Sequence, residues 1–163
     1  MVYKIRAILN VKEDVIRDVA ILKTETLEDL HNALSNAFGF EGNEMAAFYE
    51  SGDNWFQGEE FPLFNMGEGM DSKIPMREIP IENILESEND KMIYVYDFFN
   101  MWTFYIELIE ADLDCDNYAL PNTLFVLGSL PKNAPDLNFE SQSVTDFEDE
   151  EEDEDEFGFE EYM

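Results

Sequence analysis

Residues 91–110 read KMIYVYDFFNMWTFYIELIE, and they give the clearest indication of the fold. Its two halves, 91–98 and 103–110, are rich in β-branched and aromatic residues, which is typical of β-strands. The segment 99–101 lies between the halves and is long enough for a turn, so the halves are predicted to pair as an antiparallel hairpin. We expect this hairpin to form the centre of a sheet.

Two runs near the N-terminus predict a second hairpin. Apolar and polar side chains alternate over residues 2–11 and again over residues 15–21, as they do on a half-buried strand. The polar residues 12–14 separate the runs, so the second strand can fold back antiparallel on the first.

A helix is predicted directly after this hairpin. Thr26 can cap the backbone N–H of Asp29, the apolar residues that follow recur at helical spacing, and Gly39 can end the helix in the left-handed conformation. A hairpin followed by an amphipathic helix is the opening of a β-grasp or related α+β fold, in which the helix covers one face of the sheet.

Shorter elements complete the predicted domain. Strands are expected over residues 45–51, 60–64 and 123–127, and a short second helix is expected to begin at Pro80. The segment 66–78 is predicted to be a loop, and its Gly67 and Gly69 lack the context of a phosphate-binding motif.

The sequence therefore predicts one α+β domain with a mostly antiparallel sheet over residues 1–137. The remaining residues, 138–163, form an acidic tail that is predicted to be disordered, because residues 146–163 hold twelve acidic residues and no basic one.

The charge balance argues against several classes of partner. Nine basic residues face 39 acidic ones, and a net charge of −30 repels the phosphate groups of nucleic acids and anionic membranes. No apolar run approaches the roughly 20 residues of a membrane-spanning helix, and the N-terminus lacks the pattern of a secretory signal. Cys115 is the sole cysteine, so no intrachain disulfide is expected. We expect a cytoplasmic protein that binds neither nucleic acid nor membrane.

Two separated segments carry a family resemblance. The segment LEDLHNALSNAFGF at residues 27–40 resembles the LxxLHxxIxxAFGW motif of the Ri-plasmid open-reading-frame-three family. The segment YVYDFFNMW at residues 94–102 is similar to the later YxYDFGDxW motif of that family, and Ile16 and Arg17 match a Trp-Arg or Ile-Arg step before the helix. The resemblance covers residues 2–131 and implies a shared fold. The family has no established biochemical activity, and its members are sometimes described as passenger proteins of insertion elements on mobile DNA.

This sequence departs from the family pattern at positions that could have formed a site. Phe99 and Asn100 replace Gly-Asp, Phe104 stands where a His commonly follows the Trp, and Glu44 or its neighbour stands where a second His follows the AFGW segment. The departures imply that catalysis or metal binding, if other members have it, is not retained here. An enzymatic role stays open but is not favoured, and no cofactor is expected.

His31 is the only histidine, and it falls one residue from the apolar stripe of the predicted helix. A structural role is favoured over that of a general base or a metal ligand, because no second His or Cys lies nearby in the sequence. If the domain binds a small ligand or is an enzyme, we expect a pocket between the first helix and the hairpin at residues 94–102. The polar groups of that pocket would be His31, Tyr94, Tyr96 and Asp97.

Residues 112–117 (DLDCDN) resemble the start of a calcium-binding loop, because alternating carboxylates can converge on one cation. The pattern then fails, since Asn117 stands where the loop needs glycine and Thr123 stands where it needs a bidentate carboxylate. A solvated loop is favoured. Cys115 lies among these acidic residues, which disfavour a thiolate, so it is predicted to be a poor nucleophile.

Two sets of residues are candidates for contact with a partner, one at the tip of the central hairpin and one in the tail. They are Phe99, Met101 and Trp102 at the tip, and Phe147, Phe157, Phe159 and Tyr162 in the tail. The tip residues could contact a partner or a second copy, whereas a place in the core is the favoured alternative for them. Carboxylates combined with aromatic anchors suit docking on a basic protein, whereas a tail that serves only solubility is the alternative. We hypothesise a non-enzymatic, acidic protein-interaction module that engages a basic protein. The oligomeric state is not predicted.

Overall fold

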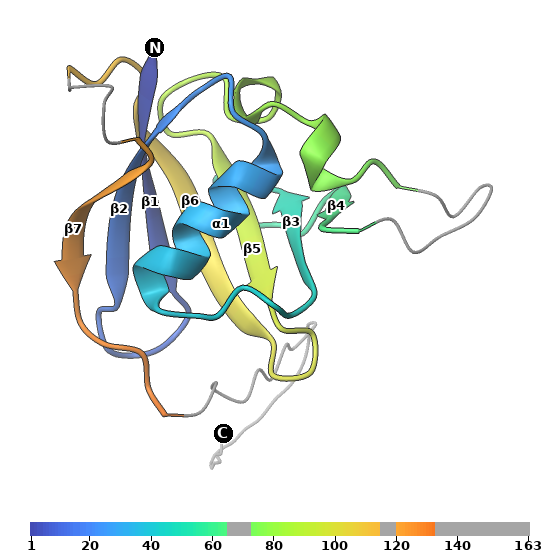
Figure 1. The fold of residues 1–163 in the computed structure, drawn as a ribbon, viewed down its shortest axis with the longest axis vertical. Coiled ribbons are helices and arrows are strands. Elements are labelled where there is room, and N and C mark those ends of the chain that lie inside the picture. Colours follow the sequence, from blue (N-terminus) through green and yellow to red (C-terminus); the bar gives the residue numbers. More distant parts are fainter. Residues whose placement is uncertain (65–72, 115–119, 133–163) are drawn as a thin grey trace.

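The computed structural model describes residues 1–64, 73–114 and 120–132. These residues form one seven-stranded sheet in which every pair of neighbouring strands is antiparallel, with one α-helix lying across a face of the sheet (Figure 1). The strand order is β4-β3-β5-β6-β1-β2-β7. The strands are β1 (Val2–Leu9), β2 (Ile16–Leu22), β3 (Ala46–Glu50), β4 (Glu60–Pro62), β5 (Lys91–Tyr96), β6 (Trp102–Glu110) and β7 (Asn122–Leu127).

Both predicted hairpins are confirmed. β5 and β6 pair around the turn at residues 97–101, with Tyr94 opposite Phe104, and they lie near the centre of the sheet. β1 and β2 pair over their whole length, with Ile5 opposite Val19. Directly opposed residues share a face of an antiparallel sheet, so one alternating set of apolar residues from all four strands points toward the helix.

The helix α1 (Leu27–Phe38) begins and ends where the sequence predicts. The Thr26 hydroxyl accepts from the Asp29 N–H at 3.2 Å, and the Asp29 carboxylate accepts from the Thr26 N–H at 2.9 Å, which completes a capping box. Gly39 ends the helix with φ of 87°. The buried stripe of α1 packs on the sheet, and the main core lies between the two layers.

The predicted second helix at Pro80 is shorter than expected. A single 3₁₀ turn, η3 (Ile81–Asn83), replaces it, and another, η2 (Met76–Glu78), lies at the end of the segment predicted to be a loop. The backbone around Pro80 pairs with the segment that leads into α1: Leu27 N–H donates to Ile79 O at 2.9 Å, and Ile81 N–H donates to Glu25 O at 2.8 Å. Because these groups are engaged in extended pairing, they do not enter a longer helix.

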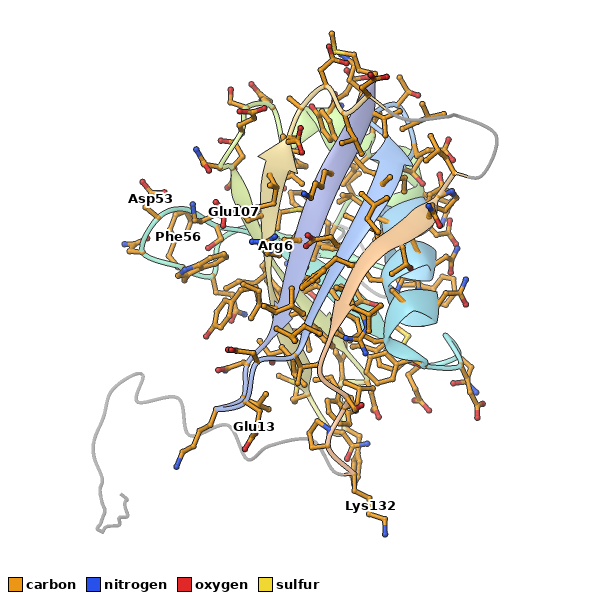
Figure 2. The ribbon with its side chains drawn as sticks, turned by 90° about the vertical axis from the view of Figure 1, so that its left-hand side faces the viewer. Arg6, Glu13, Asp53, Phe56, Glu107 and Lys132 are labelled. Atoms are coloured by element: carbon orange, nitrogen blue, oxygen red, sulfur yellow. The ribbon has the colours of Figure 1, made fainter. Side chains whose placement is uncertain are left out.

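The face of the sheet away from α1 carries polar side chains, among them Arg6 and Glu107 (Figure 2). The loop between β3 and β4 folds over part of this face, where the rings of Trp55 and Tyr105 lie 4.8 Å apart.

Likeness to a β-grasp fold stays a prediction. The predicted tail, Cys115, Asp116, Asn117 and the pair of Gly67 and Gly69 lie outside the described residues. Within the described part of the chain, no helix has the length and apolar character needed to cross a membrane.

Candidate functional site

The helix and the central hairpin meet through one buried hydrogen bond. His31 Nδ1 lies 2.6 Å from Tyr94 Oη, and the two residues are only 1% and 0% exposed. Helical spacing puts His31 beside Leu27 and Leu34 on the inward face of α1, while strand alternation turns Tyr94 toward the same space. The rings meet edge-on at 5.9 Å.

Burial keeps both members of this pair uncharged. Loss of solvation lowers the pKa of His31 to about 4 and raises the pKa of Tyr94 well above its usual value. At neutral pH a neutral imidazole and a neutral phenol therefore share the hydrogen bond. Each satisfies a polar atom that would otherwise be costly in the core.

Aromatic rings fill the space beside His31. Phe40 stacks on Tyr96 with ring centroids 4.3 Å apart and also lies 5.5 Å from Trp102. The Tyr96 hydroxyl accepts from the Gly42 N–H at 3.0 Å. Three of the four residues predicted to form a pocket, His31, Tyr94 and Tyr96, are thus brought together, and their polar groups bind protein atoms.

Asp97, the fourth predicted pocket residue, lies at the hairpin tip. Its carboxylate accepts from the Phe99 N–H at 3.1 Å and from the Asn100 side-chain amide at 2.6 Å. Its own N–H donates to Met45 O at 2.7 Å, and its φ is 64°. Asp97 therefore shapes the turn, a role typical of Asp in tight turns.

The residues of the hairpin tip that are predicted to contact a partner differ in how far they are exposed to solvent. Phe99 is 92% exposed on the turn that Asp97 holds, and Met101 is half-buried. Trp102 is 8% exposed and packs against Phe40 in the core. Phe99 is thus presented to solvent, whereas Trp102 is not. The tail residues Phe147, Phe157, Phe159 and Tyr162 lie outside the described residues.

A polar groove that the sequence did not predict lies where the β3–β4 connection meets the segment before β5. Its volume is about 330 Å³. Three carboxylates and one ammonium group line it, and the Ser51 hydroxyl, also in its wall, is buried without a hydrogen-bond partner. The lining residues are Glu50, Ser51, Gly52, Asp53, Ile84, Asn89, Asp90 and Lys91. The two contributing segments lie over 30 positions apart, so no local sequence signal could have revealed the groove.

Lys91 is already engaged by the protein. Its Nζ donates to Asn89 O at 2.8 Å and to the Asp53 carboxylate at 3.2 Å, lies 3.7 Å from Glu107, and sits 5.7 Å from the Trp55 ring. Because these groups neutralise the ammonium, the groove presents the acidity of its other carboxylates. A cation or a hydrogen-bond donor is the ligand that such a lining favours.

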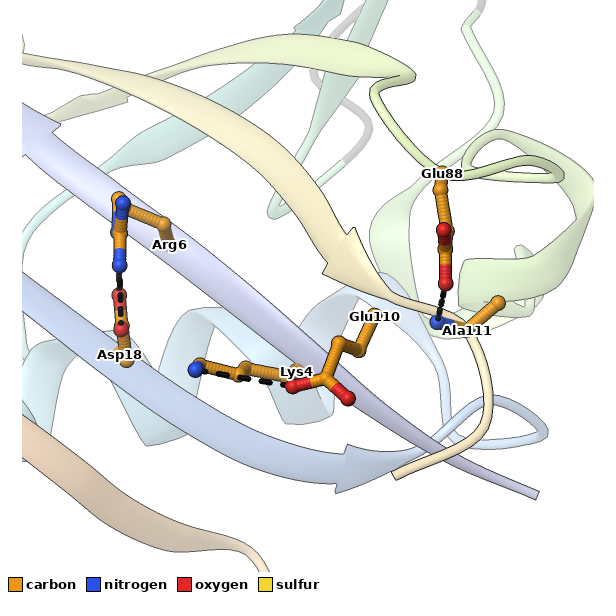
Figure 3. A network of polar contacts seen from close by, with 6 residues as sticks. All are labelled: Lys4, Arg6, Asp18, Glu88, Glu110 and Ala111. Atoms are coloured by element: carbon orange, nitrogen blue, oxygen red, sulfur yellow. Dashed lines mark hydrogen bonds and ion pairs between the residues drawn. The ribbon is translucent and has the colours of Figure 1, made fainter. Parts of the chain in front are cut away.

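Other basic side chains are likewise bound to carboxylates. Arg6 forms a bidentate pair with Asp18 at 2.9 and 3.0 Å, and Lys4 lies 3.7 Å from Glu110 (Figure 3). Lys23 lies 3.4 Å from Glu82. These cations are therefore not available to offset the remaining carboxylates at the surface. Among the described residues, no group of three or more His, Cys, Asp or Glu is placed to hold a metal ion.

Comparison with known protein families shows which family the chain matches. Residues 2–135 match the family described as plasmid pRiA4b ORF-3-like protein. The chain belongs to this family. In the structure, the two motifs of the pRiA4b ORF-3-like family meet in the His31–Tyr94 hydrogen bond. The Ile-Arg step also has a structural role, because Arg17 donates from Nε to Ala37 O and from Nη1 to Leu127 O, both at 3.0 Å.

A solved structure supports the fold. The chain is similar to a protein of unknown function, MM3350, from Methanosarcina mazei Go1, with a TM-score of 0.62 and 16% sequence identity. The match covers 77% of this chain and 68% of the other. At this identity the likeness shows the fold alone. Among curated proteins, none matches the chain.

Proposed function

We propose that this pRiA4b ORF-3-like protein is a non-enzymatic, acidic protein-interaction module that binds a basic partner protein. The observation that carries the proposal is the polar groove, which Glu50, Asp53 and Asp90 line together with a single ammonium group, that of Lys91, which Asp53 and Glu107 already neutralise. A Lys or Arg side chain of a partner fits this lining, because charge-assisted hydrogen bonds to carboxylates are among the stronger ones in proteins.

The net charge of −30 supports the same partner chemistry over longer distances. A strongly acidic protein attracts a basic one and raises the rate of encounter, whereas the short-range contacts decide specificity. Phe99, almost fully exposed on an ordered turn, can supply an aromatic anchor at a second contact. The tail at residues 146–163 adds carboxylates and aromatic residues of the same character.

The alternative, a ligand pocket between α1 and the central hairpin, has less support. His31 and Tyr94 bind one another, the Tyr96 hydroxyl binds the Gly42 N–H, and Phe40 stacks on Tyr96. Asp97 is committed to the turn. A ligand at this place would have to displace contacts that the core already makes.

The test compares charge-reversed variants of equal net charge. One variant carries Glu50→Lys and Asp53→Lys in the groove, and the matched control carries Glu13→Lys and Asp14→Lys in the exposed β1–β2 turn. Proteins captured from native lysate by each form and by the natural chain are washed at low and high salt and identified by mass spectrometry. The captured protein is then purified, and its affinity for all three forms is measured by calorimetry.

We expect a basic protein that high salt releases and that the groove variant binds at least about tenfold more weakly than the control does, since two carboxylates of the groove become ammonium groups that repel a basic side chain. Deleting residues 146–163 should slow association while leaving the groove contact in place. Equal loss in the groove variant and the control would show that overall charge, and not the groove, determines binding. Capture of no basic protein at low salt would contradict the proposal itself.

A further inference from the structure

The two margins of the sheet, β4 and β7, differ in how their free edges are protected (Figure 1). β4 has three residues and includes Glu60 and Pro62, whereas β7 has six residues with no charge and no proline. Short strands, charges and prolines protect natural edges, because bare backbone N–H and C=O groups pair readily with another chain. Within the described part of the chain, β2 is the only strand that pairs with β7. As far as the described residues show, the outer edge of β7 is therefore open.

The last four side chains of β7, residues 124–127, are apolar and exposed on both faces of the sheet. Phe125 lies opposite Asp18 and Val126 lies opposite Arg17, so these neighbours point to different faces. The exposed fractions are 41% for Leu124, 44% for Phe125, 59% for Val126 and 41% for Leu127. No residue from 120 to 131 is charged, although 29% of the chain is. A contiguous apolar patch of this kind marks a contact surface in a soluble protein.

β7 is also held firmly enough to act as a template. Arg17 Nη1 donates to Leu127 O at 3.0 Å. At Gly128 the chain passes so close to the β1–β2 turn that an added Cβ would lie 2.2 Å from Asp14 O. The register with β2 shifts once, at Leu124, and pairing continues on both sides of the shift. The open edge is thus an ordered strand.

We propose that β7 pairs with β7 of a second copy of this chain, antiparallel about a two-fold axis, so that the sheets of the two copies become continuous. Antiparallel pairing of identical strands is self-complementary, because each edge supplies the N–H and C=O groups that the other lacks. The apolar side chains on both faces then cover their counterparts.

Charge favours a second copy over a basic protein at this edge. A basic partner finds no carboxylate along residues 120–131. The electrostatic repulsion between two acidic copies, in contrast, is smallest where neither copy carries charge. The rest of each copy still carries the repulsion of a −30 chain. Salt should therefore strengthen this self-association, although it weakens binding of a basic partner, so the two proposals fail independently.

The test is sedimentation of the full chain at low and high salt, about 50 and 500 mM NaCl. We expect a mass that approaches about 38 kDa, twice the 19.0 kDa of one chain, with tighter association at the higher salt. Val126→Glu should weaken self-association at least about tenfold, because it buries an unpaired charge of each copy in the apolar contact. Phe64→Glu, which adds the same charge at a residue 51% exposed beside β4, should leave it unchanged within about twofold.

Three outcomes would overturn the proposal. The natural chain could remain at 19.0 kDa in both salts, or Val126→Glu could associate as strongly as the natural chain does. Amide hydrogen exchange supplies the third, because protection of residues 122–127 in the dimer must depend on protein concentration. Protection that is independent of protein concentration would show that a segment of the same chain, and not a second copy, pairs with the edge of β7.

Discussion

His31 shows how a single residue of a family motif acts as a structural group. Its Nδ1 contacts the Tyr94 hydroxyl at 2.6 Å inside the core, and its ring faces Tyr96 at 6.3 Å. Since burial keeps the imidazole neutral, the hydrogen bond ties the helix to the hairpin without placing a charge in the core.

The free energy of unfolding should therefore depend on pH through His31. Its pKa is about 4 in the folded state against 6.5 in the unfolded chain, so the unfolded chain takes up the proton first as the pH falls. The stabilisation is complete above pH 6.5 and declines as the pH falls toward 4. Between pH 7.5 and 5.0 we expect the natural chain to lose about 2 kcal/mol more than His31→Gln does.

Urea unfolding at the two pH values measures this difference, because protonation of surface carboxylates is common to both proteins and cancels. Tyr94→Phe serves as the control, since it removes the hydrogen-bond partner and leaves the histidine buried. It should retain the pH dependence. Equal pH dependence in the natural chain and His31→Gln would show that the imidazole is accessible to protons in the folded protein.

At the scale of elements, glycines fix the ends of α1 and β7. Gly39 and Gly128 both have positive φ, 87° and 75°. They differ in their surroundings, because an added Cβ meets nothing within 4 Å at Gly39 but would lie 2.2 Å from Asp14 O at Gly128. The backbone at Gly128 thus packs directly against the β1–β2 turn.

This contrast predicts unequal effects of the same substitution. Gly39→Ala should cost roughly 1 kcal/mol, the penalty of placing alanine in the left-handed conformation. Gly128→Ala should cost more than that, because the contact with Asp14 O must also open. Chemical denaturation of both variants gives the comparison, and equal losses would mean that the end of β7 moves away without cost.

At the scale of the whole molecule, the acidic surface opposes the folded state. Even without the tail, residues 1–145 hold 27 acidic and nine basic residues. Several of the basic side chains are paired, including Arg6 with Asp18, whose side chain is 2% exposed. Repulsion among the remaining carboxylates is screened by salt, whereas an ion pair whose carboxylate is buried is screened less.

The melting temperature at neutral pH should therefore rise with salt, by several degrees between about 20 and 500 mM NaCl. Circular dichroism measures the shift. The measurement is repeated with Val126→Glu, because self-association would also raise the melting temperature at high salt and this variant removes that contribution. A melting temperature that falls with salt in both proteins would mean that surface ion pairs outweigh the repulsion.

The local elements and the family follow from short stretches of the amino-acid sequence. Strand alternation predicts β1 and β2, the content of β-branched and aromatic residues predicts β5 and β6, and the cap at Thr26 together with Gly39 defines α1. The two motifs are enough to assign the chain to its family. These features depend on residues a few positions apart, whose effects on the backbone follow from steric and hydrogen-bonding rules.

The roles of the polar residues, in contrast, depend on how distant parts of the chain pack together. His31 and Tyr94 lie 63 positions apart, and their hydrogen bond exists because α1 crosses β5. Asp97 directly follows Tyr96, yet its left-handed backbone turns its carboxylate to the hairpin tip. The groove beside Lys91 and the open edge of β7 likewise arise from how distant segments pack and from which strand the sheet leaves unpaired. Packing across the chain is set by the whole molecule at once, so no local pattern encodes it.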